Sequence, residues 1–199
     1  MNNEEKFSTL DKLIGNTPLL KINFLYQRKP RCVYAKAEHY NFTGSLKDRV
    51  ALHILKKAYE KGEIFEGETI VEATSGNTGI SFAAIGAYLG HPVVIYMPDW
   101  MSDERKNLIK GFGGDVRLVS KEEGGFLGSI AQSEAFAAEG NAFLPCQISN
   151  QENSQTKKET TAPELEAQLN KFHVKPQAMV AGVETCREKF ECIYKKMKG

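Results

Sequence analysis

The chain has 199 residues, of which 41% are hydrophobic and 26% charged, and its formal net charge is +1. This composition is typical of a globular protein with one core or two small lobes, and so small a charge gives no field that would gather nucleic acid or anionic lipid. The acidic, polar start is unlike a secretion signal, and no apolar run approaches the roughly 18 residues of a membrane span, so we expect a cytoplasmic protein without nucleic-acid or membrane partners.

The first forty residues predict short elements joined by loops. Residues 1–14 are expected to be a polar lead-in with one amphipathic turn, followed by a turn at 15–18 and a short strand over 19–22. The basic stretch 27–31 predicts a solvated loop without a function, and a second strand is expected over 33–37.

Lys47 lies in the first turn of the next predicted element, a helix that runs to about Lys61. Ser45, with Asp48 three residues later, has the form of a capping box. The positive end of a helix dipole destabilises a nearby ammonium group, so we expect any dipole effect to lower the pKa of Lys47. A lysine of lowered pKa suits Schiff-base chemistry; the alternative is a solvent-exposed helical lysine without a chemical role.

From residue 68 onward, strand and helix patterns alternate with short links between them. This alternation predicts an α/β fold with a parallel, doubly wound sheet, in which ligands bind at the carboxyl ends of the strands. The expected strands are 69–73, 93–97, 116–119 and 142–144, and the expected helices are 80–89, 103–110 and 126–139.

The turn Thr74–Gly79 lies between the first of these strands and the helix that follows it. A glycine-flanked turn at a helix start leaves backbone N–H groups free, and these donors favour an anion. Asn77 adds a side-chain amide that can donate and accept hydrogen bonds. From the residues alone an anion or ligand site and plain helix capping remain equal alternatives.

The last part of the chain predicts a helix over 163–172, a buried strand over 178–181 and a basic amphipathic helix over 187–198 that packs against the body. The four cysteines show neither C-x-x-C spacing nor matched histidines, so we interpret them as free thiols and expect no metal site. They are Cys32, Cys146, Cys186 and Cys192.

Two long motifs, Asn41–Ala51 and Thr74–Gly79, resemble the lysine segment and the T-S-G-N-T-G loop of the fold-type II pyridoxal-phosphate enzymes. The cysteine synthase and cystathionine β-synthase group of that family is the most similar, and the resemblance extends from residue 7 to about residue 183. Three shorter segments support it: Gly15–Leu19, Gln147–Asn150 and Thr160–Glu164.

The resemblance implies roles for residues of both motifs. Lys47 would bind pyridoxal phosphate covalently and then remove the substrate α-proton, and Asn77 would hydrogen-bond the phenolic oxygen of the cofactor. The implied reaction is β-replacement, in which O-acetylserine and sulfide give cysteine and acetate, in a typically homodimeric enzyme. The residues expected to bind the substrate α-carboxylate are Thr74, Ser75, Gly76, Thr78 and Gln147.

The resemblance also implies a three-layer αβα architecture with a small domain over 41–150 and a partial large, cofactor-binding domain made of 1–40 and 151–199. The family's glycine-rich phosphate loop is replaced here by Gly182–Glu188, which retains one glycine of that loop. The chain therefore resembles a family member truncated at its C-terminal side, and the alternative to a cysteine synthase is an inactive fragment or a non-catalytic interaction protein. A dinucleotide-binding domain is disfavoured because no G-x-G-x-x-G follows a first strand.

Overall fold

A four-stranded parallel sheet forms the centre of the computed structural model, which describes residues 2–140 and 142–182. The order of the strands in the sheet is β5-β4-β3-β6, and all the pairs are parallel. The α/β fold with a doubly wound parallel sheet is thus confirmed. The strands are β3 (Thr69–Ala73), β4 (Val93–Pro98), β5 (Asp115–Val119) and β6 (Ala142–Phe143).

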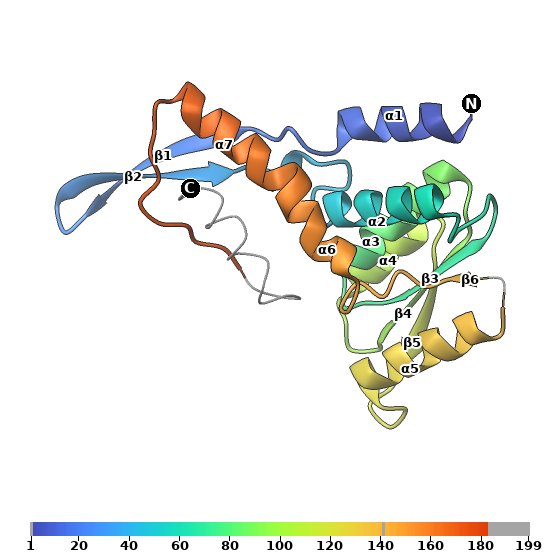
Figure 1. The fold of residues 1–199 in the computed structure, drawn as a ribbon. Helices are drawn as coiled ribbons and strands as arrows, with labels where there is room; N and C mark the ends of the chain where they lie inside the picture. Colours follow the sequence, from blue (N-terminus) through green and yellow to red (C-terminus); the bar gives the residue numbers. More distant parts are fainter. Residues whose placement is uncertain (1, 141, 183–199) are drawn as a thin grey trace.

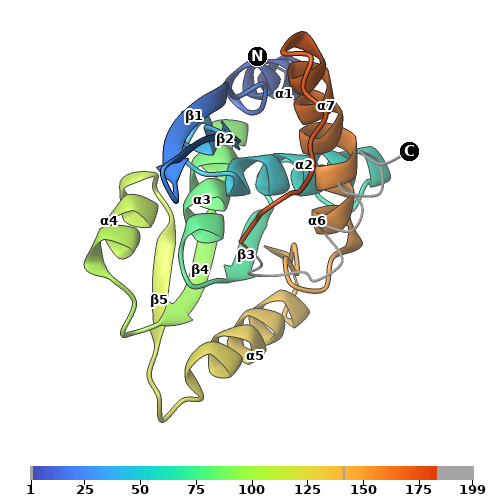
Figure 2. The same ribbon diagram turned by 90° about the vertical axis from the view of Figure 1, so that its left-hand side faces the viewer.

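Helices cover both faces of this sheet (Figure 2). On one face α3 (Asn77–Leu89) and α4 (Asp103–Gly111) contribute to the larger core cluster, and on the other face α5 (Gly125–Ala138) packs on the smaller one. Successive residues of β4 alternate between these clusters, so the strand is apolar on both sides. This explains why a continuous apolar run, and not an alternating pattern, marks β4 in the sequence.

The strand order reverses beside β3. The chain steps from β3 to β4 to β5 in one direction, and β6 then returns to the opposite side of β3. In doubly wound sheets the crevice at such a reversal, outside the carboxyl ends of the strands, is where ligands bind. The segments that follow β3 and β6 therefore meet at this crevice.

The N-terminal part differs from expectation in two places. Helix α1 (Asn3–Leu13) replaces the single amphipathic turn, because Asn2 and Glu5 form a reciprocal capping box that the sequence analysis overlooked. The expected basic loop is wrong as well: strands β1 (Leu19–Tyr26) and β2 (Lys29–Lys36) form an antiparallel hairpin with Gln27 and Arg28 at its tip. Both tip residues have positive φ, as a tight two-residue hairpin turn requires.

After the hairpin, a short 3-10 helix, η1 (Glu38–Tyr40), leads to α2 (Lys47–Lys61), which packs against α3. The polar stretch after β6 is more ordered than expected, since it forms α6 (Gln151–Thr156) and the π-helix η2 (Lys157–Thr161). These run directly into α7 (Ala162–Lys171), which lies across the hairpin side of the molecule (Figure 1).

The strand expected over 178–181 is not present, and Val180 is 95% exposed. A strand needs a hydrogen-bonded neighbour, and the described sheet ends with β6 on this side. The helix expected over 187–198 lies outside the described residues. The division into domains 41–150 and 1–40 plus 151–199 stays a prediction.

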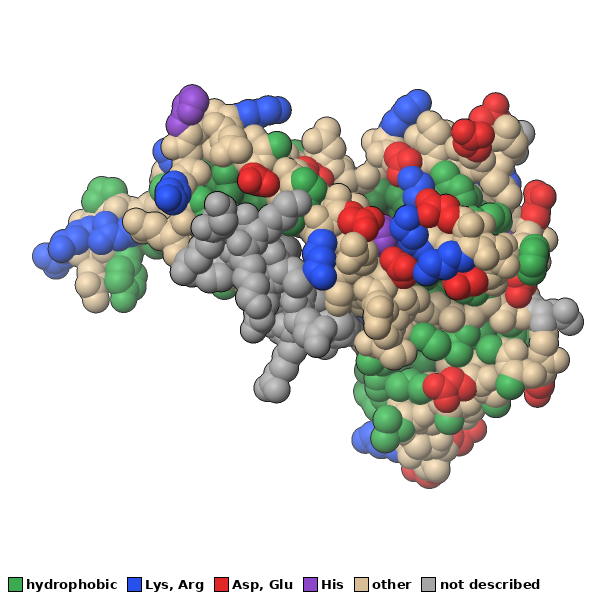
Figure 3. Space-filling model, in the orientation of Figure 1, with side chains coloured by type: hydrophobic (Ala, Val, Ile, Leu, Met, Phe, Trp, Pro, Cys, Tyr) green, Lys and Arg blue, Asp and Glu red, His purple; other side chains and the backbone are tan. Residues whose placement is uncertain are grey.

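Charges of both signs are interspersed on the face shown in Figure 3, where α2 and α6 meet. Lys61 of α2 pairs with Glu152 of α6, and His53 lies 3.1 Å from the same carboxylate. No helix in residues 2–140 or 142–182 is long and apolar enough to cross a membrane, and no cluster of three metal-ligating side chains occurs there.

Candidate functional site

Lys47 is the first residue of α2, as predicted, and only 8% of its surface is exposed. The expected capping box is wrong. The Ser45 hydroxyl accepts the backbone N–H of Lys47 at 3.1 Å, but the Asp48 carboxylate accepts from the backbone and hydroxyl of Thr43 instead. Asp48 therefore holds the loop that precedes the helix. These hydrogen bonds fix the backbone at Lys47, whose side chain is nearly buried.

The Asp48 carboxylate also joins the two long motifs. It accepts a hydrogen bond from the Ser81 hydroxyl at 2.5 Å, and the same hydroxyl lies 3.0 Å from the carbonyl oxygen of Asn77. Asp48 and Ser81 are both fully buried. The first turn of α2, with Lys47, is thereby held against the first turn of α3.

The turn Thr74–Gly79 lies at the carboxyl end of β3, at the reversal of strand order. Gly76 is the N-cap of α3 and no side chain caps the helix, so the plain capping alternative is not what the structure adopts. The Thr74 hydroxyl accepts the N–H of Gly76 at 3.2 Å and so shapes the turn before the helix begins. Ser75 and Asn77 are exposed, whereas Thr74 and Thr78 are buried. The first amides of α3 are left for another acceptor, which is the arrangement of an anion site.

A Cβ at either glycine of the turn would meet a neighbouring side chain, and at Gly79 these neighbours are packed core residues, whereas at Gly76 the neighbour is an exposed, flexible arginine. A Cβ on Gly79 would come within 2.6 Å of the Thr74 side chain and 3.1 Å of Ile95, so a larger residue would push α3 away from the sheet. A Cβ on Gly76 would lie 2.7 Å from the Arg105 side chain, which reaches from α4 to the Ser75 carbonyl at 3.3 Å.

Gln147 lies on the segment after β6 and meets the end of β3 just before this turn. Its side-chain amide donates to the Ala73 carbonyl at 3.1 Å, and its backbone N–H donates to Glu72 at 3.0 Å. The structure therefore brings Gln147 to the residue that precedes Thr74, although 74 positions separate Gln147 from Ala73 in the chain.

Glu72 was not singled out by the sequence analysis. Only 4% of its surface is exposed, and burial raises the pKa of its carboxyl to about 7, although hydrogen bonds from the backbone of Gln147 and Ala73 oppose the shift. An acidic residue inside an otherwise apolar strand was the available signal.

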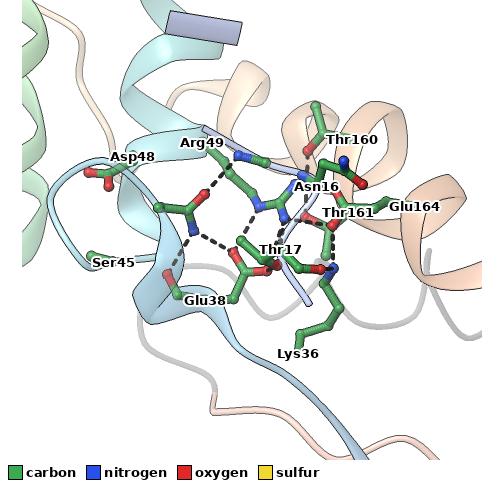
Figure 4. Close-up of polar contacts among 12 residues, drawn as sticks. Asn16, Thr17, Lys36, Glu38, Ser45, Asp48, Arg49, Thr160, Thr161 and Glu164 are labelled. Carbon is green, nitrogen blue, oxygen red and sulfur yellow. Dashed lines mark hydrogen bonds and ion pairs between the residues drawn. The ribbon is translucent and has the colours of Figure 1, made fainter. Parts of the chain in front are cut away.

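A partly buried ion-pair network around the buried Arg49 fixes the start of α2 from the other side (Figure 4). The Arg49 guanidinium donates to Glu38 at 2.8 and 3.0 Å and to Glu164 of α7 at 2.8 and 3.1 Å. Burial acts to raise the pKa of Glu164, but hydrogen bonds from Arg49 and Lys36 outweigh it and hold the value at about 2. The network ties α7 to α2. Arg49 and Glu164 belong to motifs that the sequence analysis noted, whereas Glu38 and Lys36 do not.

A cavity of about 960 Å³ opens beside Lys47. Apolar residues of β2, α2 and α7 line much of it, and Lys157 of the π-helix lies on its wall with 6% of its surface exposed. The described residues on its wall do not include the turn Thr74–Gly79 or Gln147. The predicted site residues therefore form two groups: Lys47 lies on the wall of this cavity, and the remainder lie around the end of β3. The hydrogen bond between Ser81 and Asp48 joins the two groups.

The residues present fit pyridoxal phosphate at the point of attachment. Lys47 is nearly buried and lies on the wall of a cavity whose volume is within the roughly 300–1,000 Å³ of typical ligand pockets. Of the segment Gly182–Glu188, which replaces the phosphate loop of the family, the structure describes only Gly182. Its expected departure from that loop stays a prediction.

Comparison with known proteins identifies the family of the chain. A family model described as "Pyridoxal-phosphate dependent enzyme" matches residues 10–187. A cysteine synthase of Staphylococcus aureus is 38% identical over 183 residues, which are 92% of this chain and 58% of that protein. Cysteine synthase B of Salmonella typhimurium is 39% identical over 158 residues, or 79% of this chain and 52% of that one.

Solved structures show the same likeness. A hydrogen sulfide-producing enzyme of Fusobacterium nucleatum superposes with a TM-score of 0.92 and 48% identity over 98% of this chain and 58% of that one. A cysteine synthase of Entamoeba histolytica gives a TM-score of 0.80 and 30% identity over 95% of this chain and 56% of the other. The chain thus spans little more than half the length of the relatives that it matches.

Proposed function

This chain belongs to the pyridoxal-phosphate-dependent enzyme family, and from this membership we propose that it carries out β-replacement of the cysteine synthase type. The proposed reaction converts O-acetylserine and sulfide into cysteine and acetate. The single observation that carries the proposal is the placement of Lys47, a nearly buried lysine at the first turn of a helix and on the wall of a large cavity. The 38% identity to a cysteine synthase favours this reaction within the family.

When bound, pyridoxal phosphate supplies the electron sink that makes the α-proton of an amino acid removable. We assign the covalent attachment of the cofactor to Lys47, whose amine then serves as the base that takes this proton. The fixed turn around Ser45 and Asp48 supports this role, because it leaves the lysine backbone little freedom.

We assign substrate binding to the crevice. The uncapped amides at the start of α3, with the side chains around them, would hold the α-carboxylate of the substrate. Asn77 would contact the phenolic oxygen of the cofactor from the same turn. The residues proposed for the carboxylate are Thr74, Ser75, Gly76, Thr78 and Gln147.

A second candidate is the release of hydrogen sulfide from cysteine. The observation that favours it is the 48% identity to a hydrogen sulfide-producing enzyme, which exceeds the identity to the cysteine synthases cited above. Both reactions begin with removal of the same proton and differ in the group that leaves.

The homodimer and the cytoplasmic location expected from the resemblance also stay predictions. The competing hypothesis is a family fragment without catalytic activity, since the chain spans 58% of the length of a cysteine synthase that it matches.

The deciding experiment adds pyridoxal phosphate to the protein and follows its absorbance. Lys47→Ala is the test variant, and Lys57→Ala is the matched control, because Lys57 lies on the same helix with its side chain 31% exposed. We expect a yellow adduct in the wild type and in Lys57→Ala but not in Lys47→Ala. Borohydride reduction and peptide mapping should then find the cofactor on Lys47; a folded wild type without adduct, or an adduct on another lysine, would reject the assignment.

Substrate assays on the loaded protein separate the two candidates. Cysteine formation from O-acetylserine and sulfide supports the first, whereas sulfide release from cysteine alone supports the second. A loaded protein that does neither would favour the non-catalytic hypothesis.

A further inference from the structure

Glu72 is an acidic residue buried in the central sheet. It lies in β3, two residues before the turn Thr74–Gly79 begins, and its surface is 4% exposed. One carboxylate oxygen accepts the backbone N–H of Ala73 at 2.9 Å, and the other accepts the backbone N–H of Gln147 at 3.0 Å. No ion pair to Glu72 occurs among the described residues, so the carboxylate is held by backbone donors.

Gln147 is fixed at three points around this carboxylate. Besides the bond to Glu72, its side-chain amide donates to the Ala73 carbonyl at 3.1 Å, and its own carbonyl accepts from Asn153 at 2.7 Å. We call Glu72, Ala73, Gln147 and Asn153 the Glu72 clasp. It joins β3 to the segment after β6 at the reversal of strand order, where the substrate-binding crevice is proposed.

Both oxygens of Glu72 face N–H donors, and this makes the clasp depend on ionisation. A carboxylate offers only acceptors, whereas a neutral carboxyl carries a proton on one oxygen and must donate from it. A protonated Glu72 therefore cannot accept both N–H groups equally well, and a buried donor that loses its acceptor is costly. The ionised form holds Gln147 tightly and the neutral form loosens it.

Within residues 2–140 and 142–182, burial, which raises the pKa, and two backbone hydrogen bonds, which lower it, act on Glu72. The Cys146 thiol is in electrostatic contact with it, and burial, with Glu72 and Glu134 adding to the effect, raises the pKa of this thiol. On β4 the neighbour in register is Ile95, and the other clasp residues carry no titratable group. Since the pKa of Glu72 is about 7, its ionisation changes within the physiological range.

We propose that Glu72 is a positioning residue whose ionised carboxylate fixes Gln147 at the crevice and thereby strengthens binding of the substrate α-carboxylate. The part that concerns the substrate rests on the proposed function, whereas the hold on Gln147 does not.

The first test measures the hold on Gln147 without cofactor or substrate. The backbone amide resonance of Gln147 is followed by NMR from pH 5 to pH 9 in the wild type, in Glu72→Gln and in Glu63→Gln. Glu63→Gln is the matched control because Glu63 is an exposed glutamate close in sequence. We expect the resonance to titrate with a midpoint near 7 in the wild type and the control, and to stay constant in Glu72→Gln.

A wild-type resonance that does not move near pH 7, or one that titrates equally in Glu72→Gln, would overturn the proposal. If Glu72→Gln does not fold, the wild-type titration and the carboxyl resonance of labelled Glu72 still decide the matter.

The second test measures O-acetylserine affinity of the loaded protein by its spectral change at pH 6 and pH 8. We expect wild-type binding to weaken about fivefold or more at the lower pH, and Glu72→Gln to bind weakly at both. Absence of O-acetylserine binding at either pH in the wild type would reject the proposed function, whereas wild-type binding that is tight and independent of pH would overturn the role of Glu72.

Discussion

The Ser81 hydroxyl lies 2.5 Å from the buried carboxylate of Asp48, and this contact joins the first turns of α3 and α2. Lys47 precedes Asp48 in the chain, and Asn77 lies one helical turn before Ser81. This hydrogen bond therefore adds to the packing of α2 against α3 in holding together the two motifs that carry the family resemblance. Asp48 and Ser81 thus help to set the relative position of the two motifs, although we assign neither residue a role in binding or catalysis.

Replacing Asp48 with Asn should destabilise the fold. The substitution removes the charge and one acceptor, so at least one of the donors on Thr43 and Ser81 is left unpaired in a buried place. We expect a loss of about 2 kcal/mol in the free energy of unfolding, measured by urea denaturation. Asp11→Asn is the control, because Asp11 forms an exposed pair with Lys56 and should change stability by less than about 1 kcal/mol. Equal losses of unfolding free energy in the two variants would show that the Asp48 hydrogen bonds stabilise the fold no more than an exposed ion pair does.

Glu164 should make stability fall in acid. Its pKa is about 2 in the folded protein and 4.5 as a reference, so the carboxylate stabilises the fold above pH 4.5 and loses this contribution as the pH falls toward 2. Glu164→Gln should cost about 3 kcal/mol at pH 7, because Arg49 and Lys36 lose their shared acceptor.

The difference between the wild type and Glu164→Gln should shrink below pH 4.5, as measured by urea denaturation at several pH values. Glu60→Gln is the control, since Glu60 pairs with Lys57 on an exposed surface. A difference that does not depend on pH would contradict the assigned shift.

Gly86→Ala should destabilise the protein although alanine favours helices. A Cβ at this position of α3 would lie 2.5 Å from Val93 and 3.2 Å from Ile70. The resulting overpacking should cost about 1–3 kcal/mol in thermal or chemical unfolding. Gly111→Ala, at the end of α4, meets no atom within 4 Å and should be neutral or stabilising by up to about 1 kcal/mol. Stabilisation by both substitutions would mean that helix propensity outweighs packing at Gly86.

Arg28→Gly should stabilise the β1–β2 hairpin. Arg28 has a φ of 60°, a left-handed conformation that glycine adopts without steric cost. We expect a gain of about 0.5–1 kcal/mol, detected as slower amide exchange across the hairpin and a higher melting temperature. Arg31→Gly is the comparison within strand β2, where the same change should weaken the hairpin. Faster exchange in Arg28→Gly would contradict the turn geometry.

The sequence alone predicted the sheet region well, because that region follows local rules. Strands such as 69–73 and the helices between them are marked by apolar runs of the right length and by glycines at their ends. The position of Lys47 at a helix start was also visible from the residues around it. The resemblance identified the family that the comparisons then showed.

The sequence was less informative wherever an element depends on a distant partner. The hairpin tip has no Asn-Gly signal, so the antiparallel pairing of β1 and β2 was missed and the basic loop was expected instead. Over 178–181 the sequence predicted a strand that is absent, because this apolar stretch has no neighbouring strand with which to form hydrogen bonds. The capping box at Ser45 and Asp48 failed because Thr43 and Ser81 compete for the same carboxylate.

By itself, then, the sequence determined the α/β class and the family, because periodicity and motifs are local properties of the chain. The residues expected to carry the chemistry stay a prediction. Only the tertiary structure decided which of these residues meet. Gln147 reaches Ala73 and Glu72, and Arg49 reaches Glu164, across 74, 75 and 115 positions respectively. These contacts arise from the strand order, and the raised pKa of Glu72 arises from its burial. Both depend on residues far apart in the chain, so the local sequence around one residue does not determine them.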